Sequence, residues 1–267
     1  MTRKLEGKVA VVTGASKGIG AAIARALADE GAAVVVNYSS SKSGADHVVA
    51  DIAARGGSAI AVQGDVSKRA HVERLFAEAT KAFGRLDILV SNAGVYEFGP
   101  LGDVTEELFH KHFDLNVLGL LLTTKEAVRH MGPEGGSIIN IGSGASSMRP
   151  PNSAVYTGSK AAVDAITGVL AKELGPRKIR VNSINPGMIE TEGVHTGLRG
   201  QRLPEDGRDA VAAGPYGAAR RYRADGRLAG VGRLEVHDRR VVAGVGRPEV
   251  AGERARERGA TRRDSTS

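Results

Sequence analysis

Residues 9–20 of the chain read Val-Ala-Val-Val-Thr-Gly-Ala-Ser-Lys-Gly-Ile-Gly. The first part is an apolar, β-branched run typical of a buried strand, and it leads directly into three glycines. Gly14 permits a tight turn, whereas Gly18 and Gly20 let the backbone approach a diphosphate and let a helix pack closely on the strand. The N–H groups that begin this helix favour anions. The stretch predicts a dinucleotide site, although three glycines can also form a purely structural loop.

The same alternation of strand and helix continues to about residue 185. The predicted strands cover residues 9–13, 34–36, 60–62, 86–90, 137–141 and 180–184. Helical patterns cover residues 20–30, 43–55, 68–83, 106–129 and 154–174. The strands are continuous apolar runs, which indicates that both faces of the sheet are buried. We therefore expect an α/β fold, a single Rossmann-like, doubly wound parallel sheet with helices on both faces.

The composition excludes several classes of protein. The chain has 267 residues, 41% of them apolar, which is enough for one domain with a substantial core. It has no cysteine, so disulfides and thiolate metal sites are excluded, and a reducing cytoplasm is expected. The histidines show no metal-ligand spacing, so no metal is expected. The N-terminus lacks an apolar run long enough for a signal peptide or a membrane span, and no membrane partner is expected.

The basic charge is concentrated in the last quarter of the sequence. Residues 1–195 contain 21 basic and 20 acidic side chains, whereas residues 196–267 contain 16 arginines, no lysine and 10 acids. The near-neutral first part gives no reason to expect a nucleic-acid partner. The second part, rich in Arg and Gly, can bury little apolar area, so we expect a disordered or poorly packed tail. An arginine arm that binds nucleic acid is an alternative, but acids are interspersed with these arginines.

The segment after the second predicted strand bears on the choice of cofactor. An acidic residue at this point would bind the ribose hydroxyls of NAD. The sequence reads Asn-Tyr-Ser-Ser-Ser-Lys over residues 37–42 and contains no acid. Lys17 and Ser39 could instead meet a 2′-phosphate. These residues favour NADP over NAD, unless Lys17 and the serines are simply solvated.

Tyr156 and Lys160 form the candidate catalytic pair. They lie four residues apart in a predicted helix, so they share one face and can meet the same ligand. Reduction of a carbonyl needs a proton donor at the oxygen while hydride reaches the carbon. A phenol has an ordinary pKa near 10, and we expect the nearby ammonium to lower it towards the working pH. Such a pair alone is more often an unremarkable pair on a protein surface.

Taken together, these motifs resemble the short-chain dehydrogenase/reductase family over residues 5–195. The glycine loop is similar to that family's TGxxxGxG element, Asn92-Ala-Gly94 to its NAG element, and Tyr156 with Lys160 to its YxxxK element. The resemblance implies four catalytic residues, Asn116, Ser143, Tyr156 and Lys160. It implies cofactor contacts from Gly14, Ser16, Lys17, Gly18, Ile19, Gly20, Asn37, Tyr38, Ser39, Asp65, Val66, Asn92, Ala93, Gly94, Tyr156, Lys160, Pro186, Gly187 and Thr191.

The resemblance also assigns a role to each catalytic residue. Tyr156 is the acid/base, Lys160 also binds the nicotinamide ribose, Ser143 orients the substrate oxygen, and Asn116 holds a water that links Lys160 to solvent. The substrate is expected to be a small-molecule or carrier-bound carbonyl or alcohol, as for 3-oxoacyl-carrier-protein reductases and sugar dehydrogenases. A homo-oligomer, either a tetramer or a dimer, is implied as well.

Residues 196–267 depart from the family pattern. The expected apolar helix, final strand and glycine-rich end are not legible there. Back-translation of residues 214–223 with a one-base shift allows a family-like run, Asp-Pro-Met-Gly-Arg-Leu-Gly-Asp-Thr-Glu. Our hypothesis is a single-nucleotide frameshift near residues 195–202, which the nucleotide sequence of the gene can test. The alternative function is therefore a cofactor-binding but catalytically impaired product of a frameshifted reductase gene.

Overall fold

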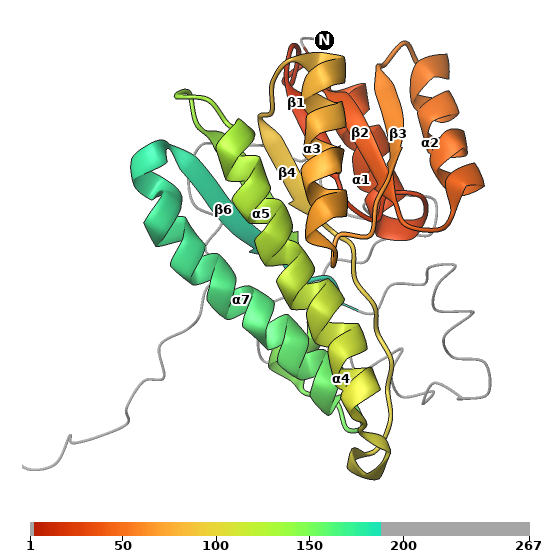
Figure 1. Cartoon of the computed structure of the whole chain (residues 1–267), viewed down its shortest axis with the longest axis vertical. Helices are drawn as coiled ribbons and strands as arrows, with labels where there is room; N and C mark the ends of the chain where they lie inside the picture. Colours follow the sequence, from red (N-terminus) through yellow and green to blue (C-terminus); the bar gives the residue numbers. More distant parts are fainter. Residues whose placement is uncertain (1–2, 188–267) are drawn as a thin grey trace, which may run out of the picture. The chain divides into compact units, whose positions relative to one another are not determined.

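The β-branched runs of the sequence form a six-stranded parallel sheet in a computed structural model, which describes residues 3–187. The strands are β1 (Val9–Val12), β2 (Ala33–Tyr38), β3 (Ala59–Gln63), β4 (Ile88–Ser91), β5 (Gly136–Ile141) and β6 (Ile179–Ile184). Their order across the sheet is β3-β2-β1-β4-β5-β6, and every neighbouring pair is parallel (Figure 1). This confirms the predicted α/β fold with a single doubly wound sheet.

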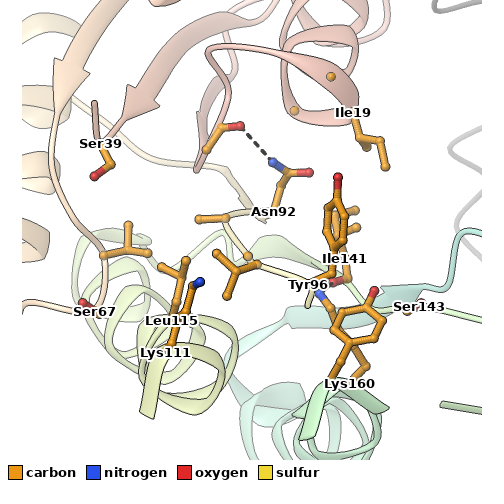
Figure 2. Close-up of a pocket in the computed structure, with 18 of the residues that line it drawn as sticks. Ile19, Ser39, Ser67, Asn92, Tyr96, Lys111, Leu115, Ile141, Ser143 and Lys160 are labelled. Carbon is orange, nitrogen blue, oxygen red and sulfur yellow. Dashed lines mark hydrogen bonds between the residues drawn. The ribbon is translucent and has the colours of Figure 1, made fainter. Parts of the chain in front are cut away.

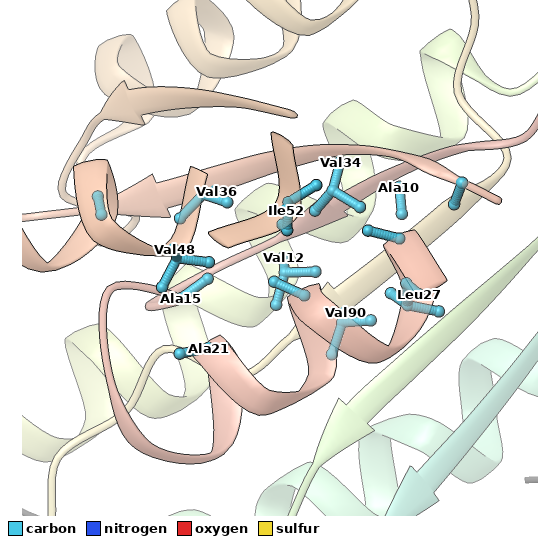
Figure 3. Packing of buried hydrophobic residues seen from close by; sticks show 14 of the residues in the cluster. Ala10, Val12, Ala15, Ala21, Leu27, Val34, Val36, Val48, Ile52 and Val90 are labelled. Atoms are coloured by element: carbon cyan, nitrogen blue, oxygen red, sulfur yellow. The ribbon is translucent and has the colours of Figure 1, made fainter. Parts of the chain in front are cut away.

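Helices cover both faces of this sheet. The longer ones are α1 (Gly18–Asp29), α2 (Lys42–Ala54), α3 (Arg69–Phe83), α4 (Glu106–Phe113), α5 (Gly119–His130) and α7 (Ala154–Leu174), and α6 (Ala145–Met148) is a single short turn. Because side chains alternate along a strand, each strand supplies two cores. Val12, Val34 and Val36 pack with residues of α1 and α2 (Figure 3). Val11 and Val35 face the other way, towards residues of α3, α5 and α7.

The strand order fixes where a ligand can bind. The chain moves outward from β1 through β2 to β3, and then returns to place β4 on the other side of β1. The connections that follow β1 and β4 therefore diverge, and a crevice opens beyond the carboxyl ends of these two strands. The glycine loop after β1 and the Asn92-Ala-Gly94 segment after β4 meet at this crevice, as the sequence motifs predict.

The single helix predicted over residues 106–129 is wrong in one respect. It is divided into α4, a π-helical turn at Asp114–Leu118, and α5. The Asn116 side chain accepts a hydrogen bond from the Val95 N–H at 2.8 Å and donates to the Val95 carbonyl at 3.0 Å. A π turn contains one residue more than an α turn, and such turns often occur at functional sites. The hydrophobic pattern of the sequence carries no sign of this insertion.

Several expectations concern parts of the chain other than residues 3–187. Thr191, the Arg/Gly-rich segment 196–267 and the frameshift hypothesis all lie outside the described residues. Among residues 3–187, no helix is both long and apolar enough to cross a membrane. The same residues contain no cluster of three or more His, Asp or Glu side chains that could hold a metal ion.

Asp87, just before β4, lies at the amino ends of the central strands β1 and β4, opposite the crevice. Its carboxylate accepts hydrogen bonds from the Val9 N–H at 3.0 Å, Lys8 Nζ at 3.2 Å and Arg85 Nη2 at 2.6 Å. Burial by itself would raise the pKa of Asp87, but the bonds from Arg85, Val9 and Lys8 together outweigh burial and hold the pKa below its ordinary value. The ionised carboxylate is therefore favoured in the folded protein.

We expect Asp87→Asn to lower the free energy of unfolding at pH 7 by about 1–3 kcal/mol. Because the folded-state pKa lies below the unfolded value, the stabilisation is present above about pH 4 and is lost as the pH falls through the folded pKa. Urea denaturation between pH 7 and pH 3 should show wild type and variant converging. Asp51→Asn, which breaks an ion pair whose carboxylate is 48% exposed, is the control and should cost less than about 1 kcal/mol. Equal effects of both substitutions would contradict this assignment.

Candidate active site

A cavity of about 1360 Å³ lies beyond the carboxyl ends of the strands (Figure 2). It is larger than the roughly 300–1,000 Å³ of ordinary small-molecule pockets, as a site for a dinucleotide and a substrate requires. The predicted site residues that line it are Gly14, Ser16, Lys17, Gly18, Ile19, Gly20, Asn37, Ser39, Asp65, Val66, Asn92, Ala93, Gly94, Ser143, Tyr156, Lys160, Pro186 and Gly187. Segments far apart in the sequence thus converge on one space.

The glycine loop forms the cradle at one wall of this cavity. Gly14 has a φ of +60°, and a Cβ added there would lie 2.9 Å from the Ala93 Cα atom. A Cβ on Gly20 would lie 2.6 Å from the Gly14 carbonyl oxygen. Lys17, the N-cap of α1, makes no side-chain capping bond, and the first-turn N–H groups of a helix have no partner within it. These free donors and the helix dipole fit a bound diphosphate.

Two asparagines hold this cradle in place. Asn92 Nδ2 donates to the carbonyl oxygens of Thr13 at 2.9 Å and Gly14 at 3.1 Å, and Figure 2 shows this side chain reaching towards the loop. Asn37 Oδ1 accepts from the Gly14 N–H at 3.2 Å, while its Nδ2 donates to the Gly64 carbonyl at 3.0 Å. Both residues were predicted as cofactor contacts, and the structure gives them a supporting role in the loop as well.

Tyr38 was also predicted to contact the cofactor, and the structure places its side chain away from the cavity. This side chain is only 7% exposed and packs in the core beneath α1 and α2, so it does not line the cavity. Alternation along β2 explains the difference, because Asn37 and Ser39 face the crevice and the residue between them must face the other way. Ser39 is exposed and lies at one end of the cavity in Figure 2, with Ser143 at the other.

Tyr156 and Lys160 lie one turn apart on α7 and both line the cavity. The Tyr156 ring is fixed by edge contacts with three other rings, and the centroid distances are 5.5 Å to Phe98, 6.4 Å to Tyr96 and 6.3 Å to His112. His112 is fully buried. The aromatic contacts hold the phenol oriented without involving its oxygen.

The expectation that Lys160 lowers the Tyr156 pKa is wrong for this structure. Burial raises the pKa of Tyr156 above its ordinary value, and a hydrogen bond with Ser143 acts in the opposite direction without reversing the shift. The Lys160 ammonium donates instead to the Ile141 carbonyl at 2.8 Å. Burial lowers the pKa of Lys160 to about 8, against the charge of Asp164, which raises it. The raised pKa keeps the phenol protonated at neutral pH, as a proton donor must be.

Asn116 lies behind the main cavity, where it lines a small polar cavity together with Lys160 and Ser91. Its Nδ2 also donates to the Ser159 hydroxyl at 2.9 Å, so the side chain joins the π turn to α7. The small cavity has room for about one water molecule, at about 10 Å³. The Ser91 hydroxyl is buried and has no hydrogen-bond partner among the described residues. Asn116 and Lys160, both predicted as catalytic residues, therefore line the same small cavity.

Sequence reasoning missed several residues that line the cavity. They are Phe98, Lys111, Met148, Pro150, Pro151 and Asn152. Lys111, on α4, donates to Glu97 at 2.5 Å. No short motif marks these positions, because they come from the segments between β4 and β5 and between β5 and α7 and are brought together only by the fold. The ring at position 98, just after Asn92-Ala-Gly94, was the one available signal.

Comparison with known proteins places the chain among dehydrogenases. A family model described as short chain dehydrogenase matches residues 8–201. An uncharacterised oxidoreductase of Methylorubrum extorquens is 62% identical over 201 residues, covering 75% of this chain and 81% of that protein. Versicolorin reductase 1 of Aspergillus parasiticus is 48% identical over 190 residues, covering 71% of this chain and 72% of that protein.

Solved structures agree with these sequence matches. A short chain dehydrogenase from Burkholderia cenocepacia in complex with NADP has a TM-score of 0.69 and 42% identity, over 71% of this chain and 78% of that one. A dehydrogenase/reductase from Sinorhizobium meliloti has a TM-score of 0.72 and 37% identity, over 79% of this chain and 81% of that one.

Proposed function

Because the chain belongs to the short-chain dehydrogenase family, we propose that it is an NADP-dependent oxidoreductase that transfers a hydride between nicotinamide and a carbonyl or alcohol substrate. At the coarser level it is an NAD(P)-dependent dehydrogenase or reductase. The observation that carries the finer proposal is the convergence of the glycine cradle, the Ser143 hydroxyl, the Tyr156 phenol and the Lys160 ammonium on one cavity.

Each of these groups has a separate task in the proposed reaction. The bound cofactor supplies the hydride. Tyr156 donates its proton to the substrate oxygen in reduction and accepts one in oxidation. Ser143, which is hydrogen-bonded to the phenol, orients the same oxygen. Lys160 holds a positive charge next to this region, and Asn116, next to the small polar cavity, keeps a route for protons from solvent.

The preference for NADP rests on the positive charge at the end of the cavity where the 2′-phosphate of NADP would lie. Lys17 and Ser39 line this end, as do Ser40 and Ser41, and no acidic side chain follows β2 there. A related structure was determined with NADP, which supports the same choice. NAD would lack the phosphate that these side chains are suited to bind.

We expect Lys17→Ala to raise the KM for NADPH by about 10- to 100-fold and to leave the KM for NADH nearly unchanged. The reason is the loss of one charge-assisted hydrogen bond of about 1.5–3 kcal/mol, which only the phosphorylated cofactor can form. Steady-state kinetics with both cofactors measure the two effects, and Lys81→Ala on the outer side of α3 is the control. Parallel losses with NADPH and NADH would argue against a phosphate contact.

We propose a small-molecule or carrier-bound carbonyl substrate with an apolar part next to the reacting group. Phe98, Tyr96 and Met148 line the cavity around Tyr156 and supply apolar contact area. Relatives named as a versicolorin reductase and a probable tetrahydroxynaphthalene reductase, 48% and 45% identical, support ring-shaped ketones as first choices. NADPH oxidation over a panel of cyclic ketones, β-ketoesters and quinones tests the proposal, and absence of turnover with every compound while NADPH still binds would reject it.

The second candidate is a cofactor-binding protein without turnover. One observation favours it, because the match to the family model ends at residue 201 of the 267 residues. The same protein would then bind NADPH through the glycine cradle but reduce none of the panel. Fluorescence titration with NADPH, run beside the activity assay, separates these two candidates.

We also propose that the chain acts in the cytoplasm as a homo-oligomer, a dimer or a tetramer. The absence of cysteine and the family resemblance support this placement. Leu118, Leu121 and Val169 are 43%, 38% and 61% exposed, and apolar surface on the π turn, α5 and α7 suits burial against a second copy. We expect light scattering to give a mass of two or four chains, and a concentration-independent monomer would contradict the proposal.

A further inference from the structure

We propose that Asp164 is a positioning residue of the active site, which ties the segments carrying Ser143 and Pro186 to the helix carrying Tyr156 and Lys160. This inference rests on the proposed oxidoreductase function, because positioning has meaning only where these groups act together. None of the sequence motifs includes Asp164, which lies on α7 one turn beyond Lys160.

The carboxylate of Asp164 accepts hydrogen bonds from two separate segments. Ser146, on the short helix α6 that follows β5, donates from its Oγ to Asp164 Oδ2 at 2.6 Å. Ser183, in β6, donates to Oδ1 at 3.2 Å. Asn185, just after β6, donates from Nδ2 to both oxygens, at 3.0 and 3.2 Å. One side chain on α7 therefore links the ends of the two neighbouring strands β5 and β6.

The bond to Ser146 reaches the substrate-binding serine. The Ser146 hydroxyl lies 2.9 Å from the Ser143 carbonyl oxygen as well as close to Asp164, so it connects the carboxylate to the backbone of Ser143. The Ser143 Oγ atom accepts from the Ala145 N–H at 3.1 Å, which fixes the direction of the hydroxyl. A shift of α6 away from Asp164 would therefore move Ser143 relative to Tyr156.

The bond to Asn185 acts on the other side of the site. Asn185 directly precedes Pro186 and Gly187, which line the cavity, and the Pro186 carbonyl accepts from the Gly144 N–H at 2.8 Å. The two segments are in close contact, because a Cβ added to Gly142 would lie 1.9 Å from Asn185 Oδ1. Asp164 thus fixes a pair of loop segments that have little room to adjust independently.

The charge of Asp164 adds a second effect that an amide could not reproduce. It opposes the influence of burial on Lys160 and raises the pKa of that ammonium. On the same helix Tyr156 lies one turn before Lys160, and the Tyr96 ring, from the segment after β4, contacts Tyr156. Loss of the carboxylate should therefore affect both the geometry of Ser143 and the protonation of Lys160.

The test is Asp164→Asn in the full-length chain. An amide has nearly the same shape, but its nitrogen cannot accept from Ser146 or Asn185. We expect kcat for ketone reduction to fall by about 10- to 100-fold, as misplacement of reacting groups can cause, with a smaller change in the Kd for NADPH.

The alkaline limb of the kcat–pH profile should move to lower pH in Asp164→Asn, because Lys160 loses the charge that raises its pKa. Ser146→Ala should lower kcat without moving this limb, and its effect should not add to that of Asp164→Asn.

A measurement independent of turnover completes the test. Hydrogen exchange of the chain without ligands should become faster at residues 142–148 and 183–187 in Asp164→Asn, with Asp51→Asn as the matched surface control. Unchanged exchange at both segments would overturn the proposal whether or not a substrate is found. An unshifted pH limb with lowered kcat would also overturn it, since a purely structural contact predicts that result. Faster exchange together with a wild-type chain that turns over no ketone would instead reject the proposed function alone.

Discussion

Replacing Tyr156 by Phe is expected to lower the rate of carbonyl reduction by about 10²- to 10⁴-fold and to leave NADPH binding nearly unchanged. The substitution removes only the phenol oxygen. The ring contacts to Phe98 and His112 do not use this oxygen, so the side chain should keep its place. Ser143 would still bind the substrate carbonyl, but no group at the same position could deliver the proton.

Single-turnover oxidation of NADPH with saturating ketone measures this loss, and fluorescence titration measures binding. Tyr38→Phe is a matched control, since it removes a phenol oxygen from a residue that packs in the core and does not line the cavity. It should retain nearly full turnover. A Tyr156→Phe variant that keeps more than about a tenth of the wild-type rate would contradict the role of Tyr156 as proton donor.

Lys160→Met is expected to abolish most turnover and, at the same time, to stabilise the folded protein at neutral pH. Lys160 is only 6% exposed, and burial lowers its pKa to about 8. Since its unfolded value is near 10.4, folding at pH 7 keeps a proton on a group that the interior disfavours, at a cost of about 3 kcal/mol. Methionine fills similar space without charge. A gain in stability with a loss of function is typical of residues kept for catalysis.

The pH dependence gives this prediction a sign that can be checked. A base with a depressed folded pKa destabilises the protein below that value, and the cost disappears as the pH rises from about 8 towards the unfolded pKa. Urea denaturation should therefore show Lys160→Met more stable than wild type at pH 7 and the difference shrinking by pH 10. Lys172→Met, on the exposed side of the same helix, should show no such convergence. A constant difference between pH 7 and pH 10 would contradict the assignment.

Much of the fold could be predicted from local patterns. Runs such as Val9–Val12 and residues 34–36 are apolar because their strands are buried on both faces, and this signal is independent of distant contacts. The glycine cradle could also be predicted. Gly14 and Gly20 sit where any Cβ would overlap neighbouring backbone atoms, so the cradle requires glycine at these two positions of the sequence. Features of this kind are encoded within a few residues of sequence.

The parts that could not be predicted depend on contacts between distant segments. The π turn around Asn116 exists because this side chain bonds Val95 and Ser159, which lie 21 and 43 residues away. The Tyr156 pKa shifts upward because burial outweighs the hydrogen bond with Ser143, and burial is a property of the whole fold. The contacts of Asp164 could not be predicted for the same reason, since its partners Ser146 and Asn185 meet it only after β5 and β6 pair.

The central claim is that the cavity formed by residues 14–187 is a carbonyl-reducing site that depends on Tyr156. The most direct test follows NADPH oxidation over the ketone panel by two proteins, this chain and the product of the gene with its reading frame restored near residue 195, each beside its Tyr156→Phe variant. We predict oxidation by at least one of the two proteins, abolished in both by Tyr156→Phe. NADPH binding by both proteins, with no oxidation that depends on Tyr156 in either, would contradict the claim.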